Sequence, residues 1–482
     1  MMLGELEDQK LLTKVIHRFP NRQIAVAGSL YWNILNVFEN LRNGMRLAIQ
    51  EADGLPLSLG IDSYCNDFGL IDRNGKLFNQ VYCYRDDRTR YNAKAIYEKV
   101  SQKELYMETG SQTALFNTSM EMAAMILEND GWQLKECQCA LMIPDLLSYL
   151  LTGQMHTEYT LASVTQLWNW KNNTWHTDIM KRLGIPVGIF PDVIPTGTIV
   201  GEVDKTYIPE IENSKIMVTA VAEHDTASAI AALPTVKDRV AYISSGTWSI
   251  VGTEVLSPIL TDDTFRYNFA YEGGVDYRYR MIKNVMGMWI LQECQRDQEM
   301  RTGQKYTYEK IDQEARQAES LKFLIDPDDD SFYMPGNMNR KVIQYCERTG
   351  QGSPESFGQI VRSVMESLAM KYRYTIENME RVLGYSLEEI HILGGGGQNR
   401  LLDQFVADAC KKPVYTGLWE AGLLGNIIVQ MRSSGQIAGL KEGRQIIRES
   451  SEIYEFTPVN PEFWDDKYDR FKKLLVGDDQ SI

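Results

Sequence analysis

A predicted strand that passes through a polar corner into a helix of small residues constrains the fold of this chain most. The strand covers residues 215–221 and the helix residues 227–233, with Asp225 at the corner between them. In α/β proteins, ligands bind at such corners, beyond the carboxyl ends of the strands. A carboxylate placed there can accept a hydroxyl proton, as phosphoryl transfer to an alcohol requires. The alternative interpretation is that Asp225 only caps the helix.

The composition excludes several classes of partner. With 482 residues, 44% of them hydrophobic and 24% charged, the chain has enough material for more than one soluble domain. The net charge of -15 argues against nucleic acid as a partner, although backbone N–H groups can still hold a nucleotide. The N-terminus is acidic, unlike a signal peptide, and no apolar run approaches the ~18 residues that cross a membrane.

The cysteines indicate a reducing compartment. There are seven, scattered and odd in number, which predicts a cytoplasmic protein rather than a disulfide-bonded secreted one. Cys137 and Cys139 form the only close pair in the sequence. No histidine lies near them in the sequence to complete a metal site, so we interpret them as incidental thiols.

Strand-like and helix-like segments alternate along the whole chain, which predicts an α/β fold. A hairpin is expected from strands at 68–72 and 77–82, joined by a tight turn at 73–76. A second unit begins after about residue 237 with a strand, a glycine-containing turn and a strand over 240–252. We therefore expect two domains, 1–236 and 237–482. Further helices are expected at 119–129, 144–151, 355–383 and 400–410, and a strand at 389–393.

Two glycine-containing turns have the chemistry to hold phosphate oxygens. Ser245-Gly246-Thr247 joins two strands and offers N–H and O–H donors, although an ordinary hairpin turn would look the same. Four glycines at 394–397 separate a strand from a helix, so a phosphate or a flat ligand can approach the backbone closely. Neither a Walker A lysine nor the dinucleotide fingerprint accompanies them. A merely flexible turn is the alternative, but each extra glycine costs about 1 kcal/mol relative to alanine, which favours a binding role.

Two further segments carry polar groups or small residues. Asn284 and Gln292 stand eight residues apart on a predicted, mostly apolar helix, from which both amides could reach a cleft. For each residue alone, a helix-capping or surface role agrees equally well with the sequence. Residues 420–426 predict a helix that packs closely against a neighbour. The sequence thus offers turns rich in hydrogen-bond donors and one carboxylate, but no cluster of metal ligands. This combination suits phosphoryl transfer from a nucleotide that backbone groups hold. Magnesium would then be held by the nucleotide and one or two carboxylates.

Nine short motifs occur in order along nearly the whole chain. They are HRFPN at 17–21, GID at 60–62, YRD at 84–86, FNT at 116–118, MIPD at 142–145, HDTAS at 224–228, SSGTWS at 244–249, KNVMG at 283–287 and GGGGQN at 394–399. Together they resemble the FGGY carbohydrate kinases, and within that family the enzymes that act on L-rhamnulose. The ordered set is far more specific than any one motif.

The resemblance implies a duplicated, actin-like and ribonuclease-H-like α/β fold with two domains around a cleft. It also implies phosphorylation of L-rhamnulose at its 1-hydroxyl with ATP and Mg²⁺, in the breakdown of L-rhamnose. The matching positions are Asp225 for the catalytic base, His224, Thr226 and Asn284 for the sugar, and Thr247, Gln292 and Gly396 for the nucleotide.

Two departures from the family pattern leave alternatives open. The family begins with a strand, a phosphate-binding loop and a second strand, whereas residues 1–6 resemble only the second strand. The first strand is therefore expected to be missing, which would leave backbone groups unpaired inside a sheet. Cys65 stands where the family has a glycine against the sugar, and Tyr64 where it has tryptophan. A kinase for another ketose, such as L-fuculose or a pentulose, and a non-catalytic sugar-binding relative are the alternatives.

Overall fold

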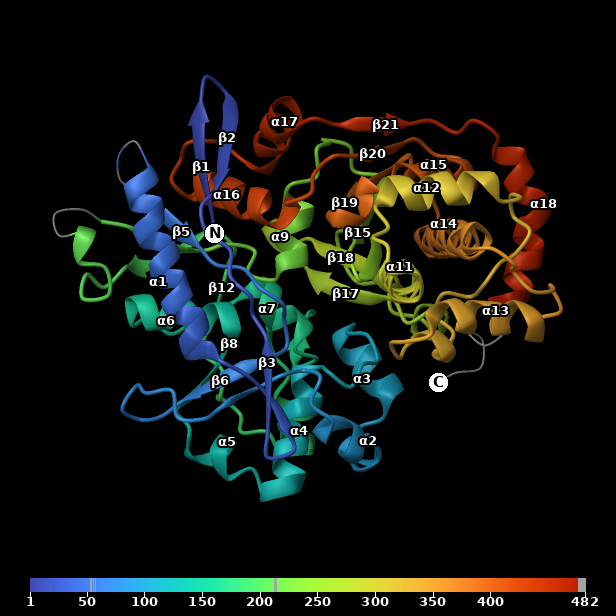
Figure 1. Ribbon diagram of the computed structural model, residues 1–482. Helices are drawn as coiled ribbons and strands as arrows, with labels where there is room; N and C mark the ends of the chain where they lie inside the picture. Colours follow the sequence, from blue (N-terminus) through green and yellow to red (C-terminus); the bar gives the residue numbers. More distant parts are fainter. Residues whose placement is uncertain (53, 55, 57, 212–214, 476–482) are drawn as a thin grey trace.

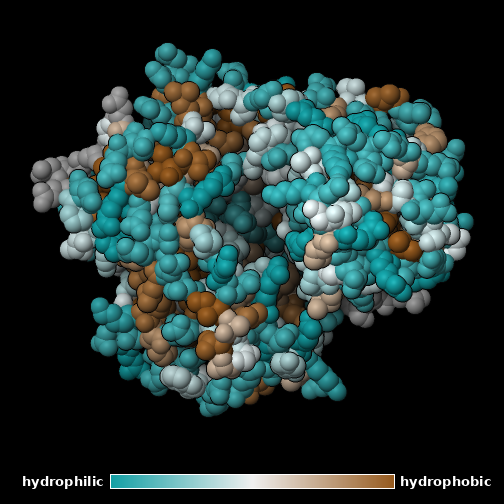
Figure 2. Space-filling model, viewed as in Figure 1, coloured by the Kyte–Doolittle hydropathy of each residue, from teal (hydrophilic) through white to brown (hydrophobic). Residues whose placement is uncertain are grey.

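The computed structural model describes residues 1–52, 54, 56, 58–211 and 215–475. Its two halves face each other across a central recess, which Figure 2 shows as a hollow between the left and right lobes. The left and lower part of Figure 1 is built from the N-terminal half of the chain, and the right part from the C-terminal half.

The N-terminal half contains many short strands and nine helices among the described residues. Its strands are β1 (Met2–Glu7), β2 (Lys10–Val15), β3 (Gln23–Val26), β4 (Ser29–Trp32), β5 (Ser58–Gly60), β6 (Phe68–Ile71), β7 (Val81–Tyr82), β8 (Cys139–Met142), β9 (Thr157–Glu158), β10 (Trp168–Asn169), β11 (Thr174–Trp175), β12 (Val193–Ile194), β13 (Thr198–Glu202) and β14 (Met217–Ala220). Its helices are α1 (Ile34–Glu51), α2 (Arg88–Lys99), α3 (Gln102–Thr109), α4 (Thr118–Asn129), α5 (Trp132–Glu136), α6 (Ile143–Thr152), α7 (Tyr159–Val164), α8 (Thr177–Leu183) and α9 (Asp225–Ala231).

The C-terminal half is built on one sheet of seven strands in the order β17-β18-β16-β15-β19-β20-β21. These strands are β15 (Val240–Ser245), β16 (Trp248–Val255), β17 (Ala270–Gly273), β18 (Tyr279–Met286), β19 (Glu389–Leu393), β20 (Val414–Thr416) and β21 (Tyr454–Phe456). The helices are α10 (Asp262–Arg266), α11 (Trp289–Thr302), α12 (Tyr308–Gln317), α13 (Met338–Arg348), α14 (Phe357–Leu383), α15 (Arg400–Cys410), α16 (Ala421–Ser433), α17 (Leu440–Ser450) and α18 (Pro461–Lys472). Every residue of β19 is buried, as expected for a strand covered on both faces.

The two halves repeat one arrangement. In the C-terminal half, β19 and β20 are parallel and α16 follows; in the N-terminal half, β5 and β14 are parallel and α9 follows. The two helices that follow, α9 and α16, pack on each other where the halves meet (Figure 1). A Cβ atom on Gly425 would lie 1.8 Å from the carbonyl oxygen of Ser228, so only glycine permits this approach. The close packing predicted for residues 420–426 is therefore confirmed.

The repeat is incomplete at one position. In the C-terminal sheet, β15 lies between the antiparallel β16 and the parallel β19. In the N-terminal half, β1 takes the place of β16 and β5 takes the place of β19. No described strand pairs with both β1 and β5, as β15 does with its two neighbours. A cavity of about 810 Å³ occupies the gap, lined by β1, α1, β5 and α16.

One local prediction was only partly right and another was wrong. The hairpin expected from 68–72 and 77–82 is present but short: its turn, a hydrogen bond from the N–H of Phe78 to the carbonyl oxygen of Leu70 (3.0 Å) and a bridge from Ile71 to Leu77 are formed. Strand β6 pairs along its length with β8, about seventy residues further along, and β7 pairs with β4. Because all four residues of β6 are buried, it pairs with another fully buried strand. Asn284 and Gln292 do not share a helix, since Asn284 lies in β18, opposite Ile250, and α11 begins only at Trp289. Short apolar runs such as 285–291 do not distinguish strand from helix.

The remaining segments agree with the sequence. The expected strands at 215–221, 240–252 and 389–393, and helices at 227–233, 355–383 and 400–410, are present with ends shifted by a few residues at most. Helix α14 begins with a capping box between Ser356 and Gln359, and ends at Gly384 with φ of 75°. Within the described residues, no helix is both long and apolar enough to cross a membrane.

Candidate active site

The backbone around Asp225 is held by the segment that follows β5. Ser63 donates its N–H to the carbonyl oxygen of Glu223 (3.0 Å) and accepts the N–H of Asp225 (2.9 Å). This bridge fixes the corner between β14 and α9, so Asp225 lies in the first turn of α9, where it borders the cavity next to β5. Its side chain is 51% exposed, while most of the neighbouring side chains in α9 are buried. The structure thus leaves the carboxylate available to a ligand.

The surroundings of Asp225 alter its acidity. The protein mass around the carboxylate raises its pKa, and the hydrogen bond from the Thr226 hydroxyl, 3.1 Å from Oδ1, opposes that shift. Arg280 also lowers the pKa, more weakly. A carboxylate with a raised pKa is a better general base than an ordinary aspartate, because proton transfer to it is less uphill.

His224 is buried beside Asp225 and is held in one tautomer. Its Nδ1 atom lies 3.0 Å from Nη2 of Arg280. Because a guanidinium only donates, Nδ1 must accept and the ring proton must be on Nε2. Burial and the Arg280 charge lower the pKa of His224 well below its usual value, so the ring is neutral. Its Nε2 lies 3.7 Å from Oδ1 of Asp225 and can donate to an oxygen bound between them.

Sequence reasoning missed the ion pair that holds His224. Glu272 of β17 and Arg280 of β18 are directly opposite in the antiparallel register, and Nη2 of Arg280 lies 3.0 Å from Oε2 of Glu272. Arg280 is fully buried and also donates from Nε to the carbonyl oxygen of Gly273. The signal available in the sequence was that Glu272 and Arg280 are charged residues within strands whose other positions are buried. Their connection to His224 appears only when distant segments are brought together.

Two of the predicted sugar positions, His224 and Thr226, contact Asp225 or this ion pair directly. Thr226 is hydrogen-bonded to Asp225, and burial together with the charges of Glu272 and Asp225 raises the pKa of the Cys65 thiol. Asn284 lies on the same face of β18 as Arg280, since residues four apart in a strand point the same way. Its amide donates to Oε1 of Gln112 (2.8 Å), across the junction of the two halves.

A series of aromatic rings begins at Tyr64, the residue before Cys65 in the sequence. Tyr64 packs on Trp32 with ring centroids 4.8 Å apart, and on Tyr84 at 6.2 Å. Tyr84 in turn meets Phe116 edge-on. These rings and Gln112 were not assigned roles from the sequence, although Tyr84 and Phe116 lie within two of the recognised motifs.

The three predicted nucleotide positions lie around the tip of the β15–β16 hairpin. Thr247 is exposed at the tip, and its carbonyl oxygen accepts N–H groups from Gly287 and Trp289 at 3.2 Å. Gln292 lies three residues into α11 from Trp289 and is half-buried. A Cβ atom on Gly396 would lie 1.9 Å from Oγ of Ser245, whereas one on Gly395 would meet nothing within 4 Å. The glycine loop therefore presses against the hairpin at one residue and leaves open space at the next.

One predicted sugar position shares a sheet with the hairpin of Thr247. Ile250, three residues beyond Thr247, is directly opposite Asn284 in the pairing of β16 with β18. Asn284 therefore lies on the strand next to the one that follows Thr247.

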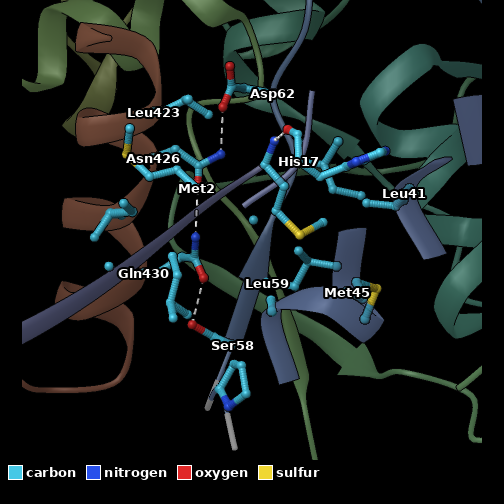
Figure 3. A pocket seen from close by; sticks show the side chains of 18 of the residues that line it. Met2, His17, Leu41, Met45, Ser58, Leu59, Asp62, Leu423, Asn426 and Gln430 are labelled. Carbon is cyan, nitrogen blue, oxygen red and sulfur yellow. Dashed lines mark hydrogen bonds between the residues drawn. The ribbon is translucent and has the colours of Figure 1, made fainter. Parts of the chain in front are cut away.

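The cavity between β1 and β5 extends to Asp225 and contains a second carboxylate. A chain of hydrogen bonds runs from the Asn426 amide to Oδ2 of Asp62 (2.5 Å), from the Gln430 amide to Asn426 (2.6 Å), and from the Ser58 hydroxyl to Gln430 (2.6 Å), as Figure 3 shows. Burial raises the pKa of Asp62 to about 7; the Asn426 bond opposes this shift and the Asp225 charge adds to it. Asp62 lies within one of the recognised motifs, but no role was assigned to it from the sequence.

Family models and curated proteins that match this chain all point to the same family, along nearly its whole length. Residues 8–231 match the N-terminal domain of the FGGY family of carbohydrate kinases, and residues 241–434 match its C-terminal domain. A rhamnulokinase of Bacteroides thetaiotaomicron is 36% identical over 474 residues, covering 98% of this chain and 96% of that protein. A rhamnulokinase of Oceanobacillus iheyensis is 36% identical over 96% of both chains, and one of Bacillus subtilis is 33% identical over 95% and 93%.

Solved structures with the same fold are more distant in sequence. A xylulose kinase from Rhodospirillum rubrum superposes with a TM-score of 0.81 at 15% identity, covering 99% of this chain and 96% of that one. A Plasmodium falciparum glycerol kinase with ADP superposes with a TM-score of 0.78 at 15% identity, covering 98% and 96%. These similarities show the duplicated two-domain architecture.

Proposed function

Because this chain belongs to the FGGY family of carbohydrate kinases, we propose that it transfers the γ-phosphoryl group of ATP to the 1-hydroxyl of L-rhamnulose. The observation that carries the proposal is the Asp225 carboxylate, half-exposed in the recess between a neutral His224 and the Thr226 hydroxyl. The similar proteins named rhamnulokinase favour L-rhamnulose over another ketose.

The proposed reaction is a direct transfer. Asp225 accepts the proton of the sugar hydroxyl, the freed oxygen bonds to the γ-phosphorus, and the bond from that phosphorus to the bridging oxygen of ADP breaks. His224 donates from Nε2 to a sugar oxygen, because Arg280 already occupies Nδ1. Thr226 and Asn284 complete the polar contacts, while Cys65 borders the sugar.

We propose that the nucleotide lies along the β15–β16 hairpin and the glycine loop. Gly395 leaves the space that a phosphate or ribose needs, and Gly396 brings the loop against Ser245. The Thr247 hydroxyl and the Gln292 amide supply side-chain hydrogen bonds. On this proposal the chain divides into a sugar-binding domain at 1–236 and a nucleotide-binding domain at 237–482, with Asn284 reaching from the second to the sugar.

Asp62, which lies beside Asp225, fits a magnesium ion bound with the nucleotide. A Cβ atom on Gly422 would lie 3.6 Å from the carbonyl oxygen of Asp225 and 3.8 Å from Oδ1 of Asp62, so both residues border the N-terminus of α16. Their mutual charge raises the pKa of Asp62, an unfavourable arrangement that a hard cation would relieve. Bound there, Mg²⁺ would neutralise charge on the phosphate oxygens.

A kinase of this type needs neither a membrane nor a nucleic-acid partner. The -15 net charge disfavours binding to a phosphate backbone, and the seven cysteines are free thiols. We therefore place the enzyme in the cytoplasm, with ATP and the sugar as its ligands.

The test is sugar-dependent ADP release with ATP and magnesium. L-rhamnulose, L-fuculose, D-xylulose and D-ribulose are compared with a no-sugar control, and we expect kcat/KM for L-rhamnulose to exceed the others by about tenfold or more. A clear preference for another ketose would replace the substrate while keeping the mechanism. Sugar binding by calorimetry without phosphoryl transfer would instead indicate a non-catalytic relative.

A further inference from the structure

Three side chains with metal-binding chemistry meet behind the corner that carries Asp225. Asp145 lies in the first turn of α6, His156 just before β9, and Glu223 two residues before Asp225. Their side chains are 0%, 5% and 0% exposed. Three segments that are distant in sequence therefore converge at one buried point.

The spacing of the three groups suits a single ion. Nε2 of His156 lies 3.3 Å from Oδ1 of Asp145 and 3.6 Å from Oε1 of Glu223, and one potential ligand atom from each residue lies within 4.8 Å of the others. An ion with bonds of about 2.1 Å in tetrahedral geometry separates its ligands by about 3.4 Å. The two separations from His156 need little adjustment to reach that value.

The hydrogen bonding around these groups is incomplete. Both ring nitrogens of His156, both carboxylate oxygens of Glu223 and Oδ2 of Asp145 are buried and form no hydrogen bond with the described residues. Buried polar atoms in folded proteins are almost always bonded, so five such atoms in one place call for a ligand. The neighbouring Glu158 shows the contrast, because its carboxylate accepts bonds from Thr160, Thr196 and the backbone N–H of Glu223.

The charges around the cluster also favour a cation. Asp145, Glu158 and Glu223 bring three fully buried carboxyl groups together, and His156 is the basic side chain that lies within 4 Å of two of them. A buried carboxylate pair without a full positive charge is costly unless it is protonated or binds a metal. One imidazole and two carboxylates form a ligand set that takes zinc or a similar divalent transition metal.

We propose that Asp145, His156 and Glu223 bind one Zn²⁺ ion that fixes the backbone of the corner carrying Asp225. The ion would join the start of α6, the approach to β9 and the end of the β14 segment. It is separate from the magnesium that accompanies the nucleotide, and the proposal does not depend on which sugar is phosphorylated.

The first experiment measures the metal content of the protein purified without added chelator. We expect about one zinc per chain in the wild type and in His176→Ala, which removes a half-buried histidine outside the cluster, and below about 0.1 per chain in His156→Ala and Glu223→Gln. Glu223→Gln keeps the size of the side chain, so a folded variant is available. Wild type that is folded and free of zinc and other transition metals, even after refolding with Zn²⁺, would overturn the proposal and indicate carboxyls that share protons.

A second readout separates an ion from packing alone. The wild type unfolded and refolded with EDTA should melt at a lower temperature than the same protein refolded with Zn²⁺, and Asp145→Asn should remove that difference. Asparagine keeps the acceptor that the N–H of Glu158 uses, at 3.0 Å from Oδ1. Equal melting temperatures for wild type refolded with and without Zn²⁺ would contradict a structural ion, whatever the kinase activity.

Discussion

Arg280 donates from Nη2 to Nδ1 of His224 across 3.0 Å, and this hydrogen bond leaves the imidazole proton on Nε2, the nitrogen that faces Asp225. The guanidinium is itself neutralised by Glu272, at 3.0 Å. The buried pair thus sets the tautomer of a residue that belongs to the other half of the molecule. The sheet of the C-terminal half therefore helps to arrange the chemistry at the N-terminus of α9.

Asp225→Asn should reduce kcat by about 10² to 10⁴-fold, the usual contribution of a positioned general base. Sugar affinity should survive, because asparagine keeps the shape and one acceptor. The variant should be no less stable than wild type, since it removes a carboxylate whose pKa is raised by the protein around it. Coupled kinetics, calorimetry with sugar, and urea unfolding test the three expectations. Turnover within a few fold of wild type would eliminate Asp225 as the base.

The activity should depend on the protonation of Asp225. Since its pKa is raised, the base is lost at a higher pH than for an ordinary aspartate, and kcat/KM should rise with pH until the carboxylate is fully ionised. Thr226→Val removes a hydrogen bond that lowers this pKa, so the acid limb should move to higher pH. Thr198→Val, which removes the hydroxyl that donates to the carbonyl oxygen of Pro195 outside the candidate site, serves as control. Identical profiles for Thr226→Val and wild type would contradict this assignment.

Arg280→Met should destabilise the fold by about 3–5 kcal/mol, because it leaves Glu272 buried without its partner. The double variant Arg280→Met, Glu272→Met should recover much of that stability, since no isolated charge remains. Both should lose activity, because His224 no longer has a fixed tautomer. Urea unfolding gives the stabilities and the coupled assay gives the rates. A double variant as unstable as the single one would show that packing dominates over charge.

The glycine loop offers a matched pair of substitutions. Gly396→Ala should destabilise the protein by about 1–3 kcal/mol and raise the KM for ATP, because the new methyl overlaps Ser245 and displaces the loop. Gly395→Ala should change stability by less than about 0.5 kcal/mol, since its methyl meets no protein atom within 4 Å. A raised KM for ATP in Gly395→Ala would then report the nucleotide itself. Equal thermal unfolding of the two variants would refute the close contact.

Cys65 should act on the sugar through its volume, because its raised pKa keeps the thiol neutral. Cys65→Ala removes the sulfur beside Asp225, and we expect the KM for L-rhamnulose to fall by about 3- to 10-fold with the KM for ATP unchanged. Cys410→Ala in α15 removes another buried thiol far from the sugar positions in the chain. The idea fails if both cysteine variants give the same sugar KM as wild type.

Local signals predicted the elements that carry the site more reliably than the contacts between them. The corner at Asp225, the hairpin at Thr247 and the loop at Gly396 each depend on residues close in sequence, and each formed where expected. The pairing of β6 with β8 and the break between Asn284 and Gln292 depend on partners far along the chain. A short apolar run carries no information about which distant strand it will meet.

The sequence by itself determined the α/β class, the strand-to-helix corners and the identity of the groups that accept protons or approach phosphates, because these follow from periodicity, glycine content and side-chain chemistry. Only the tertiary structure decided that Arg280 fixes His224, that Asp62 faces the cavity beside β1, and that Asp145, His156 and Glu223 share one buried point. The physical reason is burial. The pKa of a carboxyl and the need of a polar atom for a partner depend on what surrounds it, and those surroundings come from segments up to hundreds of residues apart.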